Sequence, residues 1–316
     1  MNNFVKKLKR PMHKILFLLV VTPIYLISLL PARVHYFFSS VITFFLFEIL
    51  GYRRNVIAVN IARSFPRLRY NEIKSIAVKF RSNFSEIIAE NIKSISRSPE
   101  NFHKIARIEN PSLLAGFHEA GVPVLIVGGH MGNWELTTRM TSFQGGESIG
   151  YKSQQLHIVY KQQHSRLSDD IIRWTRTKNS GVQLLESGSA ARTMLKNKED
   201  PGCYFLFSDQ APKPGSKFRV RFLNQETMMI NGPEIISKAA GIPVIYMEML
   251  REKRGSYLIR FHEITSNPKG CDPGFITNEF ARLLEETIVG NPDNWLWSHK
   301  RWKRGAEENS QLRKNS

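Results

Sequence analysis

The 316-residue sequence predicts an α/β domain with a mixed or mostly parallel sheet, preceded by an N-terminal membrane anchor. Short runs that are apolar at nearly every position alternate with longer amphipathic stretches. This alternation is typical of strands whose sheet is covered by helices. Before it, a basic flank leads into two apolar runs. The length allows one large domain with a sizeable core and an appended segment.

The membrane anchor is predicted for residues 1–50. The uncharged run of residues 15–30 is slightly shorter than the ~20 residues that cross a bilayer, and Pro23 interrupts it. A second, largely apolar run covers residues 41–50. No small-x-small cleavage site follows, so we expect an uncleaved tilted span or interfacial hairpin rather than a signal peptide. The basic flank favours a cytoplasmic amino terminus. Its cations are Lys6, Lys7, Lys9, Arg10 and Lys14.

The rest of the chain is predicted to form a catalytic domain, residues 51–304, and a disordered tail, residues 305–316. An amphipathic helix is expected at residues 70–95, where apolar residues recur at helical spacing. The expected strands are residues 124–127, 157–160, 203–207, 243–249 and 257–261. The expected helices between and after them are residues 167–177, 190–196, 233–240 and 277–289.

The net charge of +18 predicts an anionic partner. Phospholipid headgroups, a phosphorylated lipid, nucleic acid and an acidic protein all fit, and the charge could also serve solubility alone. The two cysteines, Cys203 and Cys271, are too few for a disulfide framework and have no metal-ligand spacing. We therefore expect no metal site and no cofactor, and we expect Cys203 in the core.

The segment VLIVGGHMGNWE, residues 124–135, is the candidate active site. A buried strand leads into Gly128 and Gly129, at the end of a strand where α/β sheets collect their reaction sites. His130 follows and is suited to act as a general base. We expect the amides of the two glycines to stabilise an oxyanion.

Glu135 is the expected partner of His130. The two are five positions apart, about 500° along one helix, so they meet only if His130 stands in the turn before the helix. The carboxylate would then orient the imidazole, as in a serine-protease triad, and the acceptor hydroxyl would be the nucleophile. Alternatively, His130 is structural and Glu135 is an acid favoured by a helix N-terminus.

Motifs along nearly the whole chain resemble bacterial lipid A late acyltransferases, members of the lysophospholipid acyltransferase superfamily. GGHMGNWE resembles the family's H-x-x-x-x-(D/E) motif. The further segments that carry the resemblance are RRNVIAVNIARSFP, VYK, LSDDIIRWTR, FSDQAP and NPDNWLWSHKRWK. The resemblance implies a glycerolipid-acyltransferase-like fold and His130 and Glu135 as the catalytic pair.

The resemblance also implies two further functional residues, Arg176 and Asp209, which match an arginine and an aspartate required in the family. Arg176 could bind a phosphate or the phosphopantetheine of the donor. Alternatively, Arg176 is an ordinary exposed arginine and Asp209 a turn residue. Lys161 stands where the family usually has arginine, so a point charge replaces a bidentate contact with substrate phosphate.

The run WLWSHKRWKR, residues 295–304, mixes tryptophans with cations. This composition suits binding to membrane headgroups or to single-stranded nucleic acid. Alternatively, the tryptophans lie in the core and only the cations are exposed.

The function implied by the resemblance is transfer of a fatty acyl chain from acyl carrier protein to a hydroxyl of a lipid A precursor or related glycolipid. We expect the enzyme at an anionic membrane, on the cytoplasmic face of the bacterial inner membrane. One alternative is an acyltransferase for another lipid acceptor, an aminolipid or a lysophospholipid. The other is a non-enzymatic, basic, membrane-attached nucleic-acid binder, which leaves GGHMGNWE unexplained and lacks a nucleic-acid motif.

Overall fold

A mixed seven-stranded sheet forms the centre of the part described by the computed structural model, residues 2–197, 201–213, 216 and 218–302. The strand order is β1-β9-β8-β2-β5-β3-β4, and among these strands only β8 and β9 pair antiparallel. The strands are β1 (Ala106–Ile108), β2 (Val124–Gly128), β3 (Leu156–Tyr160), β4 (Gln183–Glu186), β5 (Cys203–Phe207), β8 (Val244–Lys253) and β9 (Ser256–Thr265). A separate hairpin pairs β6 (Arg219–Phe222) with β7 (Gln225–Met228).

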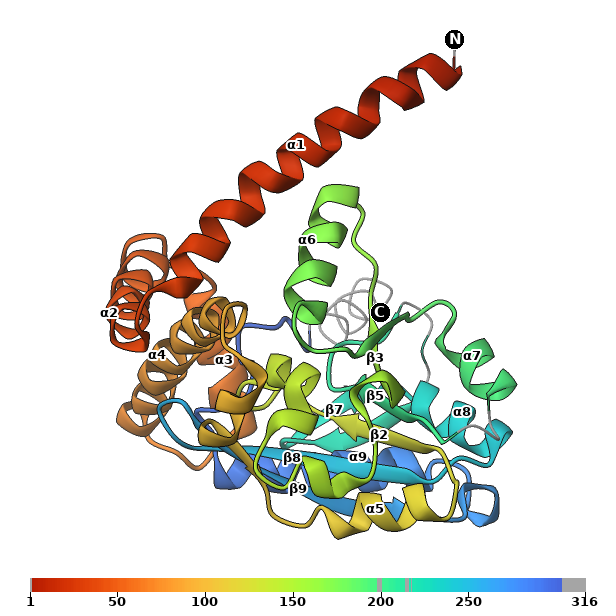
Figure 1. The fold of residues 1–316 in the computed structure, drawn as a ribbon. Helices are drawn as coiled ribbons and strands as arrows, with labels where there is room; N and C mark the ends of the chain where they lie inside the picture. The colour runs from red at the N-terminus through yellow and green to blue at the C-terminus, as the bar shows by residue number, and fades with distance from the viewer. Residues whose placement is uncertain (1, 198–200, 214–215, 217, 303–316) are drawn as a thin grey trace.

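Helices cover both faces of this sheet (Figure 1). The α-helices after the anchor are α3 (Arg54–Ser64), α4 (Tyr70–Ser94), α5 (Ser112–Glu119), α6 (Arg166–Thr177), α7 (Ala190–Lys196), α8 (Gly232–Ala240) and α9 (Phe275–Gly290). Short 3₁₀-helices are η2 (Pro99–Lys104), η3 (Trp134–Ser142), η4 (Glu147–Ile149), η5 (Ser153–Gln155) and η6 (Pro268–Gly270). The predicted mixed α/β architecture is confirmed.

Each strand and helix expected from periodicity is present, with ends shifted by a few residues at most places. The sequence patterns did not indicate the shortest elements, such as β1 with three residues and α5 with eight. Elements this short contain too few residues to show a period.

Strand β2 divides the core into two clusters because successive side chains of a strand point to opposite faces. Leu125 and Val127 join the cluster that contains Leu284 of α9. Val124 and Ile126 join the cluster on the other face, with η3 and α5. All four strand residues are at most 1% exposed, as expected for a strand covered on both faces. The strand that carries the candidate site is therefore rigidly held.

The anchor region consists of α1 (Asn2–Leu29), α2 (Ala32–Thr43) and the π-helix η1 (Phe44–Ile49). By length and composition, Met12–Leu29 and Ala32–Ile49 could cross a membrane, so the two could act as an anchor. The expected interruption at Pro23 is wrong, because α1 is continuous through it. An apolar helix tolerates the lost hydrogen bond of an internal proline where its surroundings compensate. The expected boundary after residue 50 falls between η1 and α3.

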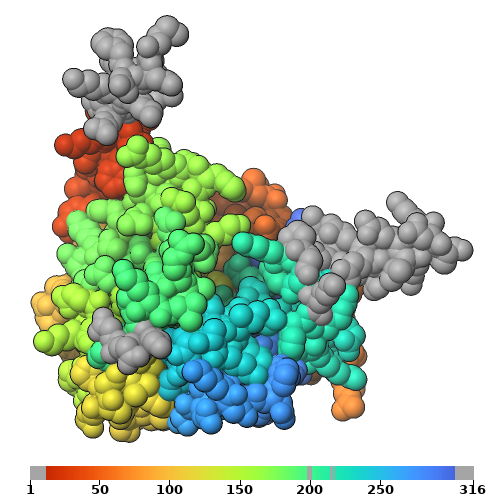
Figure 2. Space-filling model, turned by 90° about the vertical axis from the view of Figure 1, so that its right-hand side faces the viewer, coloured from red at the N-terminus to blue at the C-terminus, as the bar shows by residue number. Residues whose placement is uncertain are grey.

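Helix α1 projects from the body of the protein, yet one side of it contacts α6 (Figures 1 and 2). His13 Nε2 lies 2.8 Å from Asp170 Oδ2, and the rings of Phe17 and Trp174 are 6.5 Å apart. Much of the rest of α1 is apolar and exposed; Leu19, for example, is 64% exposed. The expected tail, residues 305–316, lies outside the described residues.

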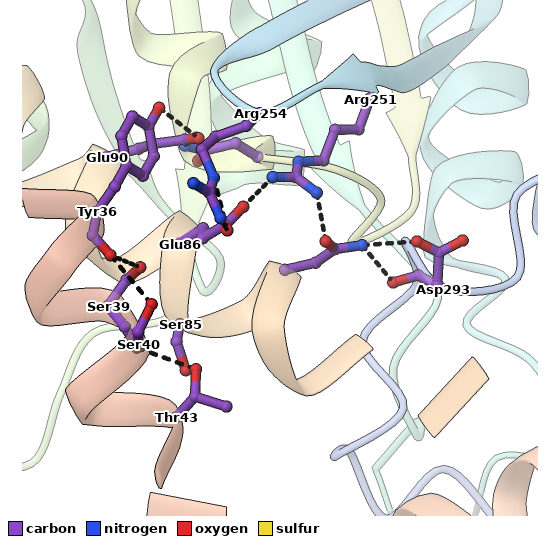
Figure 3. A network of polar contacts seen from close by, with 12 residues as sticks. Tyr36, Ser39, Ser40, Thr43, Ser85, Glu86, Glu90, Arg251, Arg254 and Asp293 are labelled. Atoms are coloured by element: carbon purple, nitrogen blue, oxygen red, sulfur yellow. Dashed lines mark hydrogen bonds and ion pairs between the residues drawn. The ribbon is translucent and has the colours of Figure 1, made fainter. Parts of the chain in front are cut away.

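A buried polar network joins α2, α4 and the end of β8 (Figure 3). Glu86 of α4, 3% exposed, pairs with both Arg251 and Arg254, the latter at 2.5 Å. Arg251 also donates to Asn83, whose amide nitrogen is 2.7 Å from Asp293 Oδ2. Since both charges of the Glu86–Arg251 pair are largely buried, neither is well solvated if its partner is lost.

We expect Glu86→Ala to destabilise the protein by about 3–5 kcal/mol, because it leaves a buried arginine without its carboxylate. Urea unfolding in detergent micelles, followed by tryptophan fluorescence, measures the change. The matched control is Glu109→Ala, which breaks the exposed pair with Arg260 and should cost about 0–1 kcal/mol. Equal losses in the two variants would show that the buried network has no special role in stability.

Candidate active site

The sheet register brings His130 and Asp209 together. Strands β2 and β5 are parallel neighbours, and Gly128 is paired with Phe207 at their carboxyl ends. His130 and Asp209 each follow two positions after this pair, so they emerge at the same edge of the sheet. Nδ1 of His130 lies 2.5 Å from Oδ1 of Asp209. The backbone N–H of His130 donates to Oδ2 of Asp209 over 2.9 Å.

The Asp209 carboxylate is buried, 2% exposed, and accepts a third hydrogen bond from Nε1 of Trp295 at 2.8 Å. Burial by itself raises the pKa of Asp209, but the charge of His130 and the three hydrogen bonds outweigh it and lower the pKa to about 2. This is below the ~3.9 of an unfolded aspartate. The interaction therefore stabilises the fold above about pH 4, and the stabilisation is lost as pH falls towards 2.

The other ring nitrogen of His130 is the one that can serve a substrate. With Nδ1 donating to Asp209, Nε2 carries a lone pair, and the Gln210 amide nitrogen lies 3.2 Å from it. Trp134 and Phe207 flank the ring at centroid distances of 5.0 and 5.4 Å, and the side chain is 15% exposed. The imidazole is thus fixed in place, and a substrate hydroxyl would have to replace the contact with Gln210 to reach Nε2.

Glu135 does not contact His130, contrary to our expectation. Glu135 lies in the first turn of η3, and its two oxygens accept from Nε and Nη2 of Arg176 at 2.7 and 2.5 Å. The partner of the imidazole is Asp209 instead. The reason is the strand register, which places Asp209 beside His130, whereas η3 carries Glu135 away towards α6.

The Glu135–Arg176 pair is bidentate and about three-quarters buried, with side-chain exposures of 27% and 24%. Burial alone lowers the pKa of Arg176, but hydrogen bonding and attraction to Glu135 outweigh it and raise the pKa above its ordinary value. Arg176 is therefore a permanently charged residue with its cation balanced by Glu135. Its Nη1 has no hydrogen-bond partner among the described residues.

Arg139 supports this pair and was not identified from the sequence. Its guanidinium is 2% exposed and donates to the carbonyls of Arg176 and Lys178 at 3.0 and 2.6 Å. These carbonyls belong to the end of α6, so Arg139 ties η3 to α6. Burial lowers the pKa of Arg139 to about 10, which still leaves it charged at neutral pH. The only feature of the sequence that could have indicated Arg139 was its position, four residues after Glu135.

The glycines of the motif serve packing and backbone geometry. A Cβ on Gly129 would collide with the end of the Leu284 side chain on α9, so glycine lets this helix side chain pack directly against the loop. Gly132 has φ of +53°, a conformation that favours glycine, and packs against Tyr257. Gly128 ends β2, and its carbonyl accepts from Ser208 at 3.1 Å.

The C-terminal tryptophans belong to the core. Trp295 and Trp297 are 2% and 0% exposed, and Nε1 of Trp302 donates to Thr227 over 2.8 Å. Of the three interpretations of this run, the one with core tryptophans and exposed cations holds for Trp295 and Trp297, but not for Arg301, which is 3% exposed and donates to the carbonyl of Met228. Cys203, as expected, is also buried.

An apolar groove of about 380 Å³ begins at the Glu135–Arg176 pair. Its walls come from α1, α4, η3 and α6. The isoleucines that line it are Ile24, Ile88, Ile92, Ile95 and Ile172. Lys161 directly follows β3 and is exposed at the carboxyl edge of the same sheet. The described residues include no group of three or more His, Cys, Asp or Glu that could hold a metal ion.

Comparison with protein families identifies the chain. Residues 1–304 match the family described as bacterial lipid A biosynthesis acyltransferase. The chain belongs to this family. It is therefore an enzyme that transfers acyl groups, with a lipid acceptor and an acyl donor, and a non-enzymatic nucleic-acid binder is excluded. A comparison with curated proteins finds no match.

We expect Asp209→Asn to lower turnover by roughly 100-fold or more, because the amide can neither fix the imidazole tautomer nor stabilise its cation. Initial rates of acyl transfer, with circular dichroism to verify folding, measure the effect. Asp272→Asn is the control, since Asp272 is exposed and remote from His130. Wild-type turnover in a folded Asp209→Asn protein would contradict a role for this carboxylate.

The contacts also predict which residues are energetically coupled. Glu135→Gln and Arg176→Gln should be non-additive in turnover, with a coupling of about 0.5–3 kcal/mol, because either one breaks the same pair. Glu135→Gln and Asp209→Asn should be closer to additive, because Glu135 does not touch the imidazole. A double-mutant cycle on kcat/KM separates the cases. Strong coupling only between Glu135 and Asp209 would favour direct orientation of His130 by Glu135.

Proposed function

We propose that the protein transfers a fatty acyl chain from acyl carrier protein to a hydroxyl of a lipid A precursor or a related glycolipid. The observation that supports this most strongly is the buried Asp209–His130 pair at the carboxyl edge of the sheet. A histidine whose Nδ1 is held by a carboxylate suits a hydroxyl acceptor, which would take the place of the Gln210 amide at Nε2. The apolar groove beside Glu135 and Arg176 suits an acyl chain.

In the proposed reaction, Nε2 of His130 removes the proton of the acceptor hydroxyl as its oxygen attacks the thioester carbonyl. The C–O bond forms and gives a tetrahedral oxyanion. Collapse of this intermediate breaks the C–S bond, and the imidazolium returns the proton to the departing thiolate. Asp209 stabilises the imidazolium in between, as the aspartate of a serine-protease triad does. The products are an ester and a free thiol, so no other reactant is needed.

Glu135 acts through Arg176 in this proposal. The bidentate pair fixes the guanidinium at the mouth of the groove, and Nη1 is available to a substrate oxygen. Lys161, at the same edge of the sheet, supplies a second cation for an anionic substrate group. Backbone N–H groups at Gly128 and Gly129 remain our candidates for stabilising the oxyanion.

We propose that the enzyme lies at the cytoplasmic face of the bacterial inner membrane. The contacts of α1 with α6 favour a helix hairpin in the interface over an isolated span, because one side of α1 is packed against protein. The exposed apolar side of α1 would then enter the lipid. The basic flank and the net charge of +18 are complementary to an anionic leaflet.

We expect turnover with acyl carrier protein to exceed turnover with acyl-CoA of the same chain length. The carrier is acidic over a larger surface, so it would engage more of the excess cations, and its apparent affinity should fall more steeply with salt. Kinetics with both donors across a salt series, with wild-type protein and the His130→Ala variant as blank, test this. Equal or better use of acyl-CoA at every salt concentration would overturn the donor assignment but not the chemistry of His130.

A panel of acceptors decides between the two acceptor classes. A phosphorylated glycolipid, an aminolipid and a lysophospholipid, each incubated with the same donor and analysed by mass spectrometry, would give a product only with the true class.

A further inference from the structure

A small cavity lies where the end of α1, the start of α2 and the end of α4 meet. Its volume is about 40 Å³, room for about three waters or the oxygens of one phosphate group. The polar side chains that line it include His35, Glu90, Lys93 and Arg97. The cavity adjoins the groove described above, since Ser94 lines both, but neither Glu135 nor Arg176 lines the cavity.

The two cations of the cavity form no ion pair with a described carboxylate, although Glu90 attracts Arg97 from a distance. Lys93 Nζ donates to the carbonyl of Ser28 at 3.0 Å, and the Arg97 guanidinium lies 5.9 Å from the ring centroid of Phe102. Within the described part of the chain, neither forms an ion pair. Nε of Arg97 is buried and has no acceptor. A buried donor without an acceptor costs stability, and an anion in the cavity would supply one.

One ring nitrogen of the cavity's histidine is also without a partner. His35 is 5% exposed, and its Nε2 has no partner.

The one carboxylate that lines the cavity, Glu90, is occupied by other groups (Figure 3). Oε1 accepts from Tyr36 at 3.1 Å, while Oε2 accepts from Tyr257 at 2.5 Å and from Asn133 at 3.0 Å. Two cations thus face one carboxylate, and the cavity has a net positive charge. Burial, followed by repulsion from Arg97, lowers the pKa of Lys93, which shows that the uncompensated charge is unfavourable there.

The position of the cavity indicates where an anion would come from. Its wall includes Ala32 and His35, at the junction between the two apolar helices of the anchor. Beside this junction, Leu29 and Phe37 are 54% and 67% exposed, which suits contact with lipid chains. Cations immediately next to such a surface lie at the depth of lipid headgroups.

We propose that this cavity binds the phosphate group of a membrane lipid. Arg97 donates through Nε, Lys93 adds a second charge, and the lipid chains lie along the exposed face of α1 and α2. The bound phosphate would connect the helices of the anchor to α4. Helix α4 also carries Glu90, which accepts from Asn133 in the segment between β2 and η3. The inference rests on the proposed membrane attachment but not on the proposed donor or acceptor.

The test compares phosphatidic acid with diacylglycerol of the same chains, because the two differ only in the phosphate. Full-length protein in neutral maltoside micelles is doped with either lipid, and its thermal melting temperature is measured over a concentration series. We expect phosphatidic acid to raise the melting temperature and diacylglycerol to have little effect. In Lys93→Gln/Arg97→Gln, the apparent affinity for phosphatidic acid should fall on the order of tenfold or more, the loss expected for one or more charge-assisted hydrogen bonds.

The matched control is Arg192→Gln/Lys196→Gln, which removes two exposed cations with the same spacing from α7. It should respond to phosphatidic acid as wild type does. If the double cavity variant is not folded in lipid-free micelles, Lys93→Gln alone gives the comparison. Equal effects of the two lipids on wild type, or an unchanged response in the cavity variant, would overturn the proposal. Equal protection by inorganic phosphate alone would show that the ion, and not a lipid, is bound.

Acyl transfer measured in the same samples separates this proposal from the proposed function. Loss of transfer in His130→Ala should leave the response to phosphatidic acid intact. Transfer without a phosphatidic acid response would refute the cavity site alone, whereas the response without transfer would refute the assigned reaction alone.

Discussion

The Asp209 carboxylate is the point on which the catalytic edge of the sheet depends. It holds the side chain and backbone of His130 and the indole of Trp295, so it joins the loop after β2, the loop after β5 and the C-terminal segment. A buried carboxylate is stable only when such donors surround it, and here they lower its pKa instead of letting burial raise it. The charge that holds the His130 imidazole therefore also joins three distant segments.

A second, largely buried ion pair lies at the apolar groove. Glu135 and Arg176 connect η3 with α6, and Arg139 fastens the same two elements through backbone carbonyls of α6. Because α6 also contacts α1, the groove beside Arg176 is built partly by the anchor helix. The groove and the exposed apolar surface of α1 are thus parts of one continuous structure.

Some cations of the protein are paired with carboxylates, whereas others form no ion pair among the described residues. Arg176 and Arg251 are neutralised by carboxylates in buried or partly buried pairs, where removal of one partner would strand the other. Lys93 and Arg97 have no such partner and face a cavity beside the anchor. Net charge by itself indicated only an anionic partner, whereas the distinction between paired and unpaired cations supports our proposal for where one binds.

The sequence by itself determined the local elements and the chemistry of the residues at their ends. The apolar runs located β2 and β5 at or near their true ends, and helical spacing located α4, because these periods reflect burial within one element. The motif also pointed to His130 as the base. Only the tertiary structure decided the partners. His130 meets Asp209 across 79 positions because β2 and β5 are parallel neighbours in register, and Glu135 meets Arg176 across 41 positions because η3 packs on α6. Strand order and helix packing follow from burying the whole core at once, so no local pattern contains them. Counted from the starts of their expected strands, at residues 124 and 203, His130 and Asp209 stand at the same position in the sequence. This match acquires meaning only once the two strands are known to be neighbours.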